Sequence, residues 1–402
     1  MKLKQGCSIY SDYGLNISAE EYSDEGVPII RTSDVDNSGA LDLSNTKFVE
    51  PHVVGTKRLQ KGDVLLSRSG TIGRAMVFDD DVEATYAAYL VRFRPHPKRL
   101  LCKFVGYWAQ SAGYWHQIGA DTIQSTIGNF NANKFANLSI PEHDLATQRR
   151  IADFLDLETA RIDLLIEKKQ RLVDMVAPRF EALIHEARKS GNWRRFGFCA
   201  QTTPRPIPHD HDATYVPLGL YNRGRGFFRK PETAYDDLGD SSFFFVEQGD
   251  FVFSGQFAWE GAVGFVSDRE HGCVVSHRYP VYTGVKGVLS DYLFAYFRSH
   301  HGQFLMDNCS RGAAGRNRPL NTRILEKEKI PVPTIELQQQ VAKVIDFERH
   351  LKEKTAPSID RLKEYRSALI TSAVTGQIDV TTHAKSGITD RRLDAIQEEM
   401  GA

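Results

Sequence analysis

The sequence predicts a mixed α/β (α+β) fold. Two globular domains form an internal pseudo-two-fold repeat, and two long helices that pair as an antiparallel coiled coil separate them. Three observations lead to this prediction. One segment occurs twice in the chain, apolar residues recur at heptad spacing after each copy, and strand-like runs precede each copy in the same order.

The repeated segment is the clearest signal in the sequence. "IPEHDLATQRRIADFLD" at 140–156 matches "IPVPTIELQQQVAKVID" at 330–346, which lies 190 residues further on. Gln148 falls on Gln338, and apolar character is kept at helical spacing through both copies. Stacked repeats have periods of about 20 to 50 residues. The much longer period seen here indicates a duplicated domain.

The repeat divides the chain into five consecutive segments. They are a first globular domain at 1–144, a central long helix at 145–190, a second globular domain at 191–334, a C-terminal long helix at 335–376 and a C-terminal tail at 377–402. In each globular domain, runs such as "DVLLS" and "DFVFSG" have the length and composition of strands. Helical stretches, "LLCKFVGYWAQSAGYWHQ" and "DYLFAYFRSHHGQFLMDN", occupy corresponding places. The loops that follow them have diverged.

The first long helix carries an apolar seam at steps of three and four residues, which is typical of a helix that packs along another helix. The seam of the second is less regular, because Glu348 and Lys352 interrupt it. The expected helix-pair or partner interface consists of Gln148, Ile151, Leu155, Ile162, Leu165, Leu172, Gln338, Val341, Ile345, Ile359, Leu362 and Leu369. Pro178 and Pro357 are expected to kink or end the helices. The alternative is two unrelated amphipathic helices, each lying on its own domain.

Composition narrows the classes of protein. The 402 residues include 51 basic and 51 acidic side chains, a balance that argues against non-specific coating of nucleic acid. No apolar run reaches the length of a membrane span and no signal segment begins the sequence, so we expect a cytoplasmic protein without a membrane partner. The five cysteines are scattered without a CxxC pair, which indicates neither a disulfide framework nor a zinc site.

Motifs for catalysis are weak. "SGTIG" and "SGQFAWEG" are Gly-rich, but neither contains the GxxxxGK[ST] pattern that grips phosphate and magnesium. "HDHD" at 209–212 lies in a Pro-rich stretch and fits a solvated loop better than a metal site. His277 has no counterpart in the first half of the chain, so we expect a packed or DNA-proximal histidine and not a general base. We therefore assign no catalytic and no metal-binding residue.

The chain resembles the DNA specificity (S) subunits of type I restriction-modification systems. The resemblance covers essentially the whole chain: the duplicated Ile-Pro exit into Gln-x-x-Ile/Val-Ala-x-x-Leu/Ile-Asp, the turn "SRSGTIGRA" and the C-terminal "LITSAVTGQIDV". It implies two target-recognition domains, each reading half of a bipartite asymmetric DNA target. It also implies two methyltransferase (M) subunits and restriction/translocase (R) subunits as partners of a non-catalytic chain. S-adenosylmethionine, ATP and Mg would then bind to those partners, and this chain would need no cofactor.

Double-stranded DNA is the ligand that the resemblance implies, and polar or basic residues on the diverged loops are the candidates to contact it. Arginine and amide side chains can form paired hydrogen bonds with base edges. The candidates are Arg68, Ser69, Thr71, Arg74, Gln124, Ser125, Asn129, Asn131, Asn133, Lys134, Arg223, Arg225, Gln256, Arg311, Arg316, Asn317 and Arg318. An alternative function stays open: a stand-alone DNA-binding or scaffold protein of the same architecture, without catalytic partners.

Overall fold

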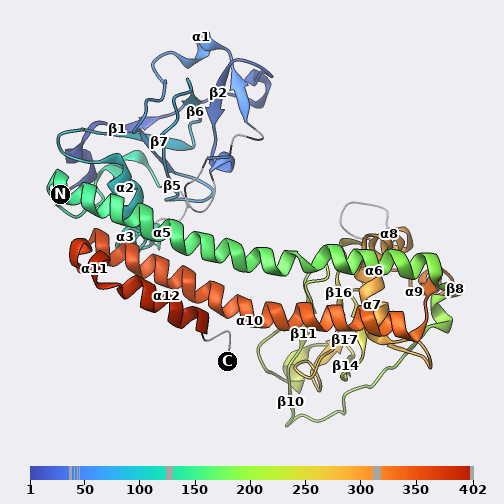
Figure 1. Ribbon diagram of the computed structural model, residues 1–402. Coiled ribbons are helices and arrows are strands. Elements are labelled where there is room, and N and C mark those ends of the chain that lie inside the picture. The colour runs from blue at the N-terminus through green and yellow to red at the C-terminus, as the bar shows by residue number, and fades with distance from the viewer. Residues whose placement is uncertain are drawn as a thin grey trace. The chain divides into compact units, whose positions relative to one another are not determined.

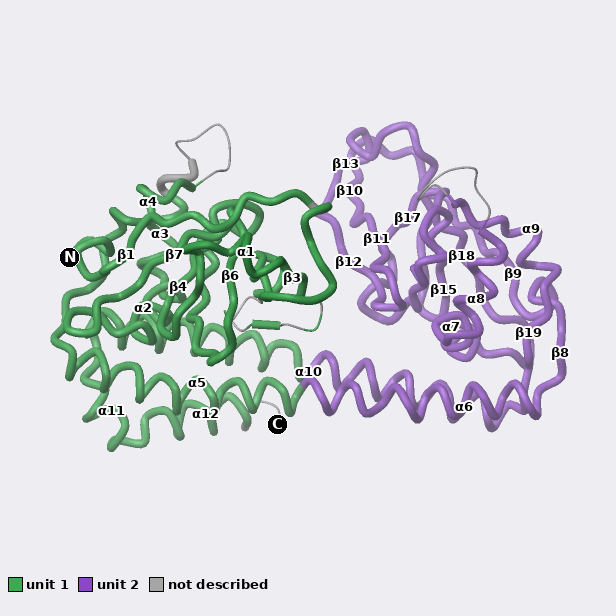
Figure 2. Tube along the Cα trace, turned by 90° about the horizontal axis from the view of Figure 1, so that it is seen from above, with its two compact units in different colours: residues 1–169, 355–402 green, residues 170–354 purple. Residues whose placement is uncertain are grey.

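The computed structural model describes residues 1–35, 39, 41, 42, 44, 46–123, 130–310 and 318–398 (Figure 1). The chain divides into two compact units, coloured green and purple in Figure 2. Unit 1 contains residues 1–169 and 355–402, and unit 2 contains residues 170–354. Each unit thus combines one globular domain with parts of the long helices.

Unit 1 is built on a four-stranded antiparallel sheet in the order β1–β7–β4–β5. Its strands are β1 (Cys7–Tyr13), β4 (Val64–Ser67), β5 (Ala75–Val77) and β7 (Leu90–Pro95). A second sheet has the order β3–β2–β6, formed by β2 (Val27–Ile30), β3 (Lys47–Val49) and β6 (Thr85–Tyr86). Short helical turns are η1 (Leu3–Gly6), η2 (Ala19–Glu21), η3 (Thr32–Asp34) and α1 (Pro51–Val54).

Both faces of strand β4 are covered, which explains its continuous apolar run. Successive side chains of a strand point to opposite faces. Val64 and Leu66 belong to the core that includes Phe104 of helix α2 (Cys102–Trp108), whereas Leu65 packs in a separate core with Tyr86. A strand buried on both faces cannot alternate apolar with polar residues. The sequence "VLLS" therefore follows from its central place in the sheet.

Unit 2 repeats the four-stranded sheet in the equivalent order β9–β18–β15–β16. Its strands are β9 (Ala200–Thr202), β15 (Phe251–Phe253), β16 (Val263–Phe265) and β18 (Val281–Gly284). Four further strand pairs are β8 (Asn192–Arg195) with β19 (Lys329–Val332), β10 (Thr214–Tyr215) with β13 (Thr233–Ala234), β11 (Leu218–Leu220) with β12 (Phe227–Arg229), and β14 (Phe243–Phe245) with β17 (Val274–Ser276). Short helical turns are η4 (Phe196–Phe198), η5 (Tyr235–Leu238) and η6 (Ala258–Glu260).

The expected helix in each globular domain is present, and in both units it is split at a serine. In unit 1, α2 is followed by α3 (Ala112–Ile123), and Ser111 at the break donates its hydroxyl to Trp108 O at 2.6 Å. In unit 2, α7 (Ser290–Arg298) is followed by α8 (His300–Cys309), and Ser299 donates to Tyr296 O at 2.6 Å. One short helix then precedes the repeated segment in each unit: α4 (Ala132–Ala136) and α9 (Thr322–Leu325).

A buried glutamine makes the same three hydrogen bonds in both units. The Oε1 atom of Gln148 accepts Leu101 N–H at 2.8 Å, and its Nε2 atom donates to the carbonyls of Arg99 and His143 at 3.1 and 2.8 Å. The Oε1 atom of Gln338 accepts Leu289 N–H at 2.8 Å, and its Nε2 atom donates to Gly287 O and Pro333 O at 3.1 and 3.0 Å. The duplication seen in the sequence is thus a duplication of structure.

The central helix consists of two parts, α5 (Leu145–Asp174) and α6 (Val176–Ser190), whereas α10 (Ile335–Val374) is continuous. The interruption is at Met175, three residues before Pro178, and Pro178 itself lies in the first turn of α6, so the break predicted at this proline falls slightly upstream of it. Pro357 lies inside α10, so of the two outcomes predicted for it, a kink or an end of the helix, the end is wrong. A proline removes only one backbone donor. Continued packing of Leu362 and of residues beyond it in the unit 1 core keeps the helix intact.

Within unit 1, helices α5 and α10 run antiparallel. His143 Nε2, just before α5, lies 2.9 Å from Val374 O at the end of α10, and Asp163 further along α5 accepts Arg366 Nε at 2.9 Å. Partner numbers fall along α10 as they rise along α5, which is the antiparallel pattern. Within unit 2, α6 shares an apolar core with the first half of α10. The predicted helix pairing is therefore confirmed.

The last segment differs from the expected tail. Residues beyond α10 form α11 (Val380–Ser386) and α12 (Ile388–Glu398), which belong to unit 1. Leu393 and Ile396 of α12 are 4% exposed and join the core that contains Leu362. Asp390 pairs with Arg161 of α5. The apolar residues of α12 are few and far apart in the sequence, which is why their packing role was not evident.

Candidate nucleic-acid interface

The turn after strand β4 holds the first group of candidates in unit 1. Ser67 N–H donates to Arg74 O at 2.9 Å, and Gly73 N–H donates to Ser67 O at 2.8 Å, so the turn is closed on itself. Gly73 has φ +86°, a value that glycine adopts at little cost. The turn leaves Thr71 exposed and Ser69 half-buried. These hydroxyls lie on a rigid part of the backbone.

A second candidate loop meets this turn. Phe130 N–H donates to Arg68 O at 3.2 Å, and Arg68 N–H donates to Tyr89 O at 2.9 Å. Segments that are far apart in the sequence therefore converge at one end of the four-stranded sheet. We call this end, formed by residues 68–74, 89 and 130–134, the recognition edge of unit 1. Gln124, Ser125 and Asn129 lie outside the described residues.

Several candidates on this edge have structural partners of their own. Asn131 caps α4, because its side-chain oxygen accepts Lys134 N–H at 2.9 Å. Arg74 Nη1 donates to Val35 O at 2.5 Å, and the Arg68 guanidinium lies 4.9 Å from the centre of the Tyr13 ring. Lys134 Nζ lies 5.5 Å from the centre of the Phe130 ring, and Asn133 is exposed. For Asn131 the structure gives a capping role, and Asn321 caps α9 in the same way.

Unit 2 has an equivalent recognition edge around the turn after β15. Ser254 N–H donates to Ala262 O at 2.9 Å, and Leu320 N–H donates to Gly255 O at 2.8 Å. We define this edge as residues 221–226, 255–261, 278 and 318–320. Gln256 is exposed on it. Arg311, Arg316 and Asn317 lie outside the described residues.

Arginine side chains on the unit 2 edge are placed differently from one another. Arg318 pairs with Asp307 at 2.7 Å, and its guanidinium lies 5.1 Å from the Trp259 ring centre. Arg225 lies 5.1 Å from the Tyr221 ring centre. Arg223 is exposed in the same loop as Arg225. The charge on this edge is therefore partly neutralised and partly available to a ligand.

Exposed aromatic side chains were missed by the sequence reasoning. In unit 1, Tyr89 is 62% exposed and Tyr10 is 53% exposed; in unit 2, Phe257 is 39% exposed and Tyr221 is 44% exposed. Such rings can stack or pack against nucleic acid. Aromatics next to strands are normally read as core residues, so the sequence gives no signal that separates these from the buried ones.

A charge cluster supports the sheet behind the unit 1 edge. Asp12 accepts Tyr86 OH at 2.7 Å and Arg92 Nη2 at 2.5 Å, and it pairs with Lys57. Burial opposes ionisation of Asp12, but the hydrogen bonds from Lys57 and Tyr86 and the charge of Arg92 together lower its pKa below the usual value. The carboxylate therefore stays charged and fixes β1 to β7.

The second charged group is an aspartate that occurs in both units. Asp63 accepts Gln60 N–H at 2.9 Å and Arg94 Nε at 2.6 Å. In unit 2, Asp250 accepts Glu247 N–H at 2.9 Å and Arg205 Nη1 at 2.7 Å. The aspartate is thus common to both sheets, whereas its arginine comes from a different strand or loop.

The expected helix-interface residues fall into three groups. Ile151, Leu155, Ile162, Leu362 and Leu369 are buried in the unit 1 core, and Val341 and Ile345 in the unit 2 core. Leu165 and Ile359 are half-buried, and Leu172 is 48% exposed. The interface role expected of Gln148 and Gln338 needs correction. Each fixes its helix to its own globular domain through the three hydrogen bonds described above.

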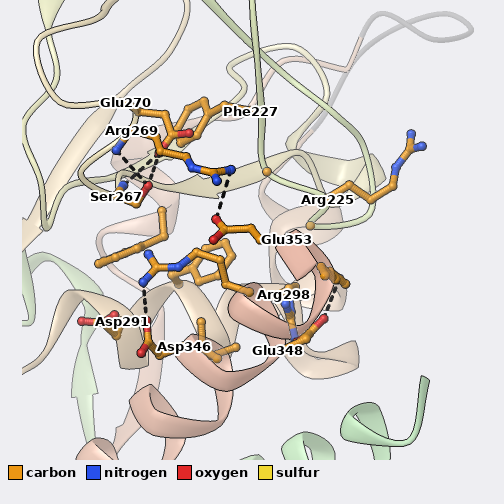
Figure 3. Close-up of a pocket in the computed structure, with 17 residues that line it drawn as sticks. Arg225, Phe227, Ser267, Arg269, Glu270, Asp291, Arg298, Asp346, Glu348 and Glu353 are labelled. Atoms are coloured by element: carbon orange, nitrogen blue, oxygen red, sulfur yellow. Dashed lines mark hydrogen bonds and ion pairs between the residues drawn. The ribbon is translucent and has the colours of Figure 1, made fainter. Parts of the chain in front are cut away.

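Unit 2 also contains a pocket of about 260 Å³ between α7, the first half of α10 and the loop around Arg225 (Figure 3). Several of its charged side chains pair with one another. Arg298 pairs with Glu348, and Arg269 lies 3.2 Å from Glu353. Arg225 points away from these pairs (Figure 3). Burial raises the pKa of the Asp291 carboxyl group. The balance of charges gives this pocket no preference for an anion or a cation.

The histidines of the "HDHD" stretch contact side chains of the neighbouring turn η5. His211 Nδ1 lies 2.6 Å from Asp236, and His209 contacts Tyr235. Among the described residues, no group of three or more His, Cys, Asp or Glu side chains is placed to hold a metal ion. In the same part of the chain, no helix is long and apolar enough to cross a membrane. Cys199, Cys273 and Cys309 are buried, whereas Cys7 and Cys102 are half-buried.

Comparison with known proteins gives a consistent result. The family described as type I restriction modification DNA specificity domain matches residues 2–173 and 212–356. The type I restriction enzyme EcoKI specificity subunit of Escherichia coli (strain K12) is 18% identical over 419 residues, which cover 96% of this chain and 88% of that protein. The type I restriction enzyme StySPI specificity subunit of Salmonella potsdam is 24% identical over 196 residues, which cover 47% of this chain and 40% of that protein.

Two solved structures resemble the fold. One is described under "Structural basis underlying complex assembly and conformational transition of the type I R-M system"; it has a TM-score of 0.59 at 13% identity, covering 94% of this chain and 97% of that one. The S subunit of a type I restriction-modification system from M. genitalium has a TM-score of 0.50 at 13% identity, covering 93% of this chain and 95% of that one. The family match spans well over half of the sequence. The chain belongs to the type I restriction modification DNA specificity domain family and is a specificity (S) subunit.

Proposed function

We propose that this S subunit binds an asymmetric, bipartite DNA sequence, with one half read at each recognition edge. The observation that supports this proposal is that the two units share the same backbone arrangement but carry different side chains on their recognition edges. In both units a buried glutamine bonds to three backbone groups. Both units also have a closed turn, after β4 in unit 1 and after β15 in unit 2, and a second loop that bonds to this turn. Thr71 and Asn133 lie on one edge, whereas Gln256 and Arg223 lie on the other. Different side chains on equivalent backbones would read different bases.

We further propose that the chain does no chemistry itself and directs M and R subunits to the target. The methyltransferase would bring S-adenosylmethionine, and the translocase would bring ATP and Mg. The described residues of this chain contribute positioned hydrogen-bond donors, rings and a few charges, which is what recognition needs. Phosphate contacts from basic residues would set the position of the subunit on the duplex without reading sequence.

The experiment is co-expression of this chain with a type I methyltransferase (M) subunit from the same organism, in a host without other adenine methylation, followed by genome-wide mapping of methylated adenines. We expect an interrupted motif of two unlike halves, methylated only when both proteins are present. Methylation without this chain, or methylation at a continuous motif, would overturn the proposal. Copurification without any methylation would favour the scaffold alternative.

A further inference from the structure

The loop between β11 and β12 in unit 2 has an unusual backbone. Arg223 has φ +59°, the left-handed region that side chains other than Gly, Asn and Asp rarely adopt. In the described part of the chain, Ser11 is the one other non-glycine residue with positive φ, and it lies in unit 1. Strained residues of this kind persist where the surrounding structure fixes them, and they concentrate at functional sites.

Backbone hydrogen bonds fix Arg223 on the unit 2 recognition edge. Arg223 N–H donates to Glu260 O at 2.9 Å, and Gly224 N–H donates to Gly261 O at 2.7 Å. The Asn222 side chain also bonds to Glu260. The loop therefore rests on the turn that carries Gln256. Two consecutive backbone bonds leave the Cα atom of Arg223 little freedom to move relative to that turn.

The Arg223 side chain, in contrast, is exposed. Among the described residues its guanidinium has no hydrogen-bond or ion-pair partner, whereas Arg318 on the same edge is paired with Asp307. Glycine would satisfy the backbone at this position with less strain, as it does at Gly224 and Gly226 in the same loop. A strained arginine that has no side-chain partner among the described residues is therefore better explained by a ligand than by the fold.

We propose that Arg223 is a specificity-determining residue that donates two hydrogen bonds to the major-groove edge of a guanine in the half-site read by unit 2. This inference rests on the proposed function. The guanidinium fork matches the O6 and N7 acceptors of guanine. A two-point contact needs a fixed direction, which a rigid backbone supplies, whereas a phosphate contact tolerates a mobile side chain.

The test uses the full chain in complex with its methyltransferase and duplex oligonucleotides that contain the mapped motif. The variant Arg223→Gly removes the side chain and suits the backbone, so its melting temperature should not fall. Arg223→Lys keeps the charge without the fork. Arg229→Ala, an exposed arginine on strand β12 of the same hairpin, serves as the matched control. Binding is measured to the motif, to duplexes with one G·C pair changed, and to duplexes with one guanine replaced by 7-deazaguanine.

We expect wild type to discriminate one guanine of the unit 2 half-site by about tenfold or more. Arg223→Gly and Arg223→Lys should lose that discrimination at this one position, and 7-deazaguanine there should weaken wild type but not the variants. Arg229→Ala should behave as wild type. Equal weakening on all sequences with a lower salt dependence would show a phosphate contact and overturn the inference. Unchanged discrimination in Arg223→Gly would also overturn it. A wild-type complex without sequence preference would instead refute the proposed function.

Discussion

Replacing Gln148 by alanine should loosen one globular domain from its helix and leave the other unaffected. Gln148 is 1% exposed, and its side chain satisfies three backbone groups, the Leu101 N–H and the carbonyls of Arg99 and His143. A typical net contribution is about 1 kcal/mol per hydrogen bond, so the three together amount to about 3 kcal/mol. The groups left behind are backbone groups that cannot move away, so repacking offers little relief.

The assay is hydrogen exchange of the intact chain, read on peptides from each unit. In Gln148→Ala the amides of 101–108 should lose about a hundredfold in protection, because about 1.4 kcal/mol corresponds to a factor of ten. Peptides covering 289–298 in unit 2 should be unchanged. Gln338→Ala is the matched variant, since Gln338 makes the corresponding bonds at 2.8, 3.1 and 3.0 Å, and its effect should fall on unit 2 alone. Equal effects on both units, or no effect in either variant, would refute the reasoning.

Three further predictions concern unit 1 and the central helix. Ending the chain after Gln377 removes α11 and α12 and with them the burial of Leu393 and Ile396. Full burial of one such side chain contributes about 1.5 to 3 kcal/mol, so unit 1 should lose up to about 6 kcal/mol in denaturant unfolding and bind an apolar dye. An unchanged midpoint would contradict the packing role of α12. Ile162→Ala, at a fully buried position, should cost about 2 to 5 kcal/mol, whereas Leu172→Ala, at a position 48% exposed, should cost less than about 1 kcal/mol; similar costs would argue against the helix packing. The pKa of Asp12 is lowered in the folded protein, so its stabilising contribution is present above the unfolded pKa of about 3.9 and is lost as the pH falls through the folded value. Asp12→Asn should therefore be less stable than wild type at pH 7 but lose less stability on acidification, and equal acid sensitivity in both proteins would contradict this; exposed Asp24→Asn is the control.

The duplication was predictable because the residues that it preserves have one physical role in both copies. Gln148 and Gln338 align in the sequence, but their role could not be read from it. A glutamine at the start of a helix is equally compatible with an exposed partner surface. Only the hydrogen bonds from Leu101 N–H to Gln148 and from Leu289 N–H to Gln338 show that each glutamine bonds to its own globular domain.

The helices were predicted from apolar spacing, and two departures from that prediction depend on packing with residues further along the chain. At Pro357 a single lost donor was outweighed by packing further along α10, which sequence spacing near the proline does not show. In the last segment, Leu393 and Ile396 are three residues apart, too short a pattern to indicate a buried helix. Their burial depends on contact with the second half of α10, which belongs to unit 1. Nothing in the sequence next to Leu393 and Ile396 indicates this contact.

The candidate residues for DNA contact were predictable as segments and not as individual side chains. The segment at 68–74 and the segment ending at Lys134 do meet, through Phe130 and Arg68. Which members are exposed depends on local bonds. Asn131 is used as a helix cap and Arg74 bonds to a backbone carbonyl, whereas exposed Tyr89 was not a candidate. A residue type does not reveal whether its hydrogen bonds are already made within the protein.

The most direct test of the account is an exchange of recognition domains followed by mapping of methylated adenines. Residues 1–144 are replaced by the corresponding region of a relative whose own target is known. The donor should keep the backbone groups that bond to Gln148 and a tyrosine at the position of Tyr107, whose hydroxyl donates to Asp156 at 2.7 Å. We predict that the exchanged subunit directs methylation to a motif with one half from the donor and the other half unchanged. A motif in which both halves change together, or in which neither changes, would contradict the claim that each unit reads its own half of the target.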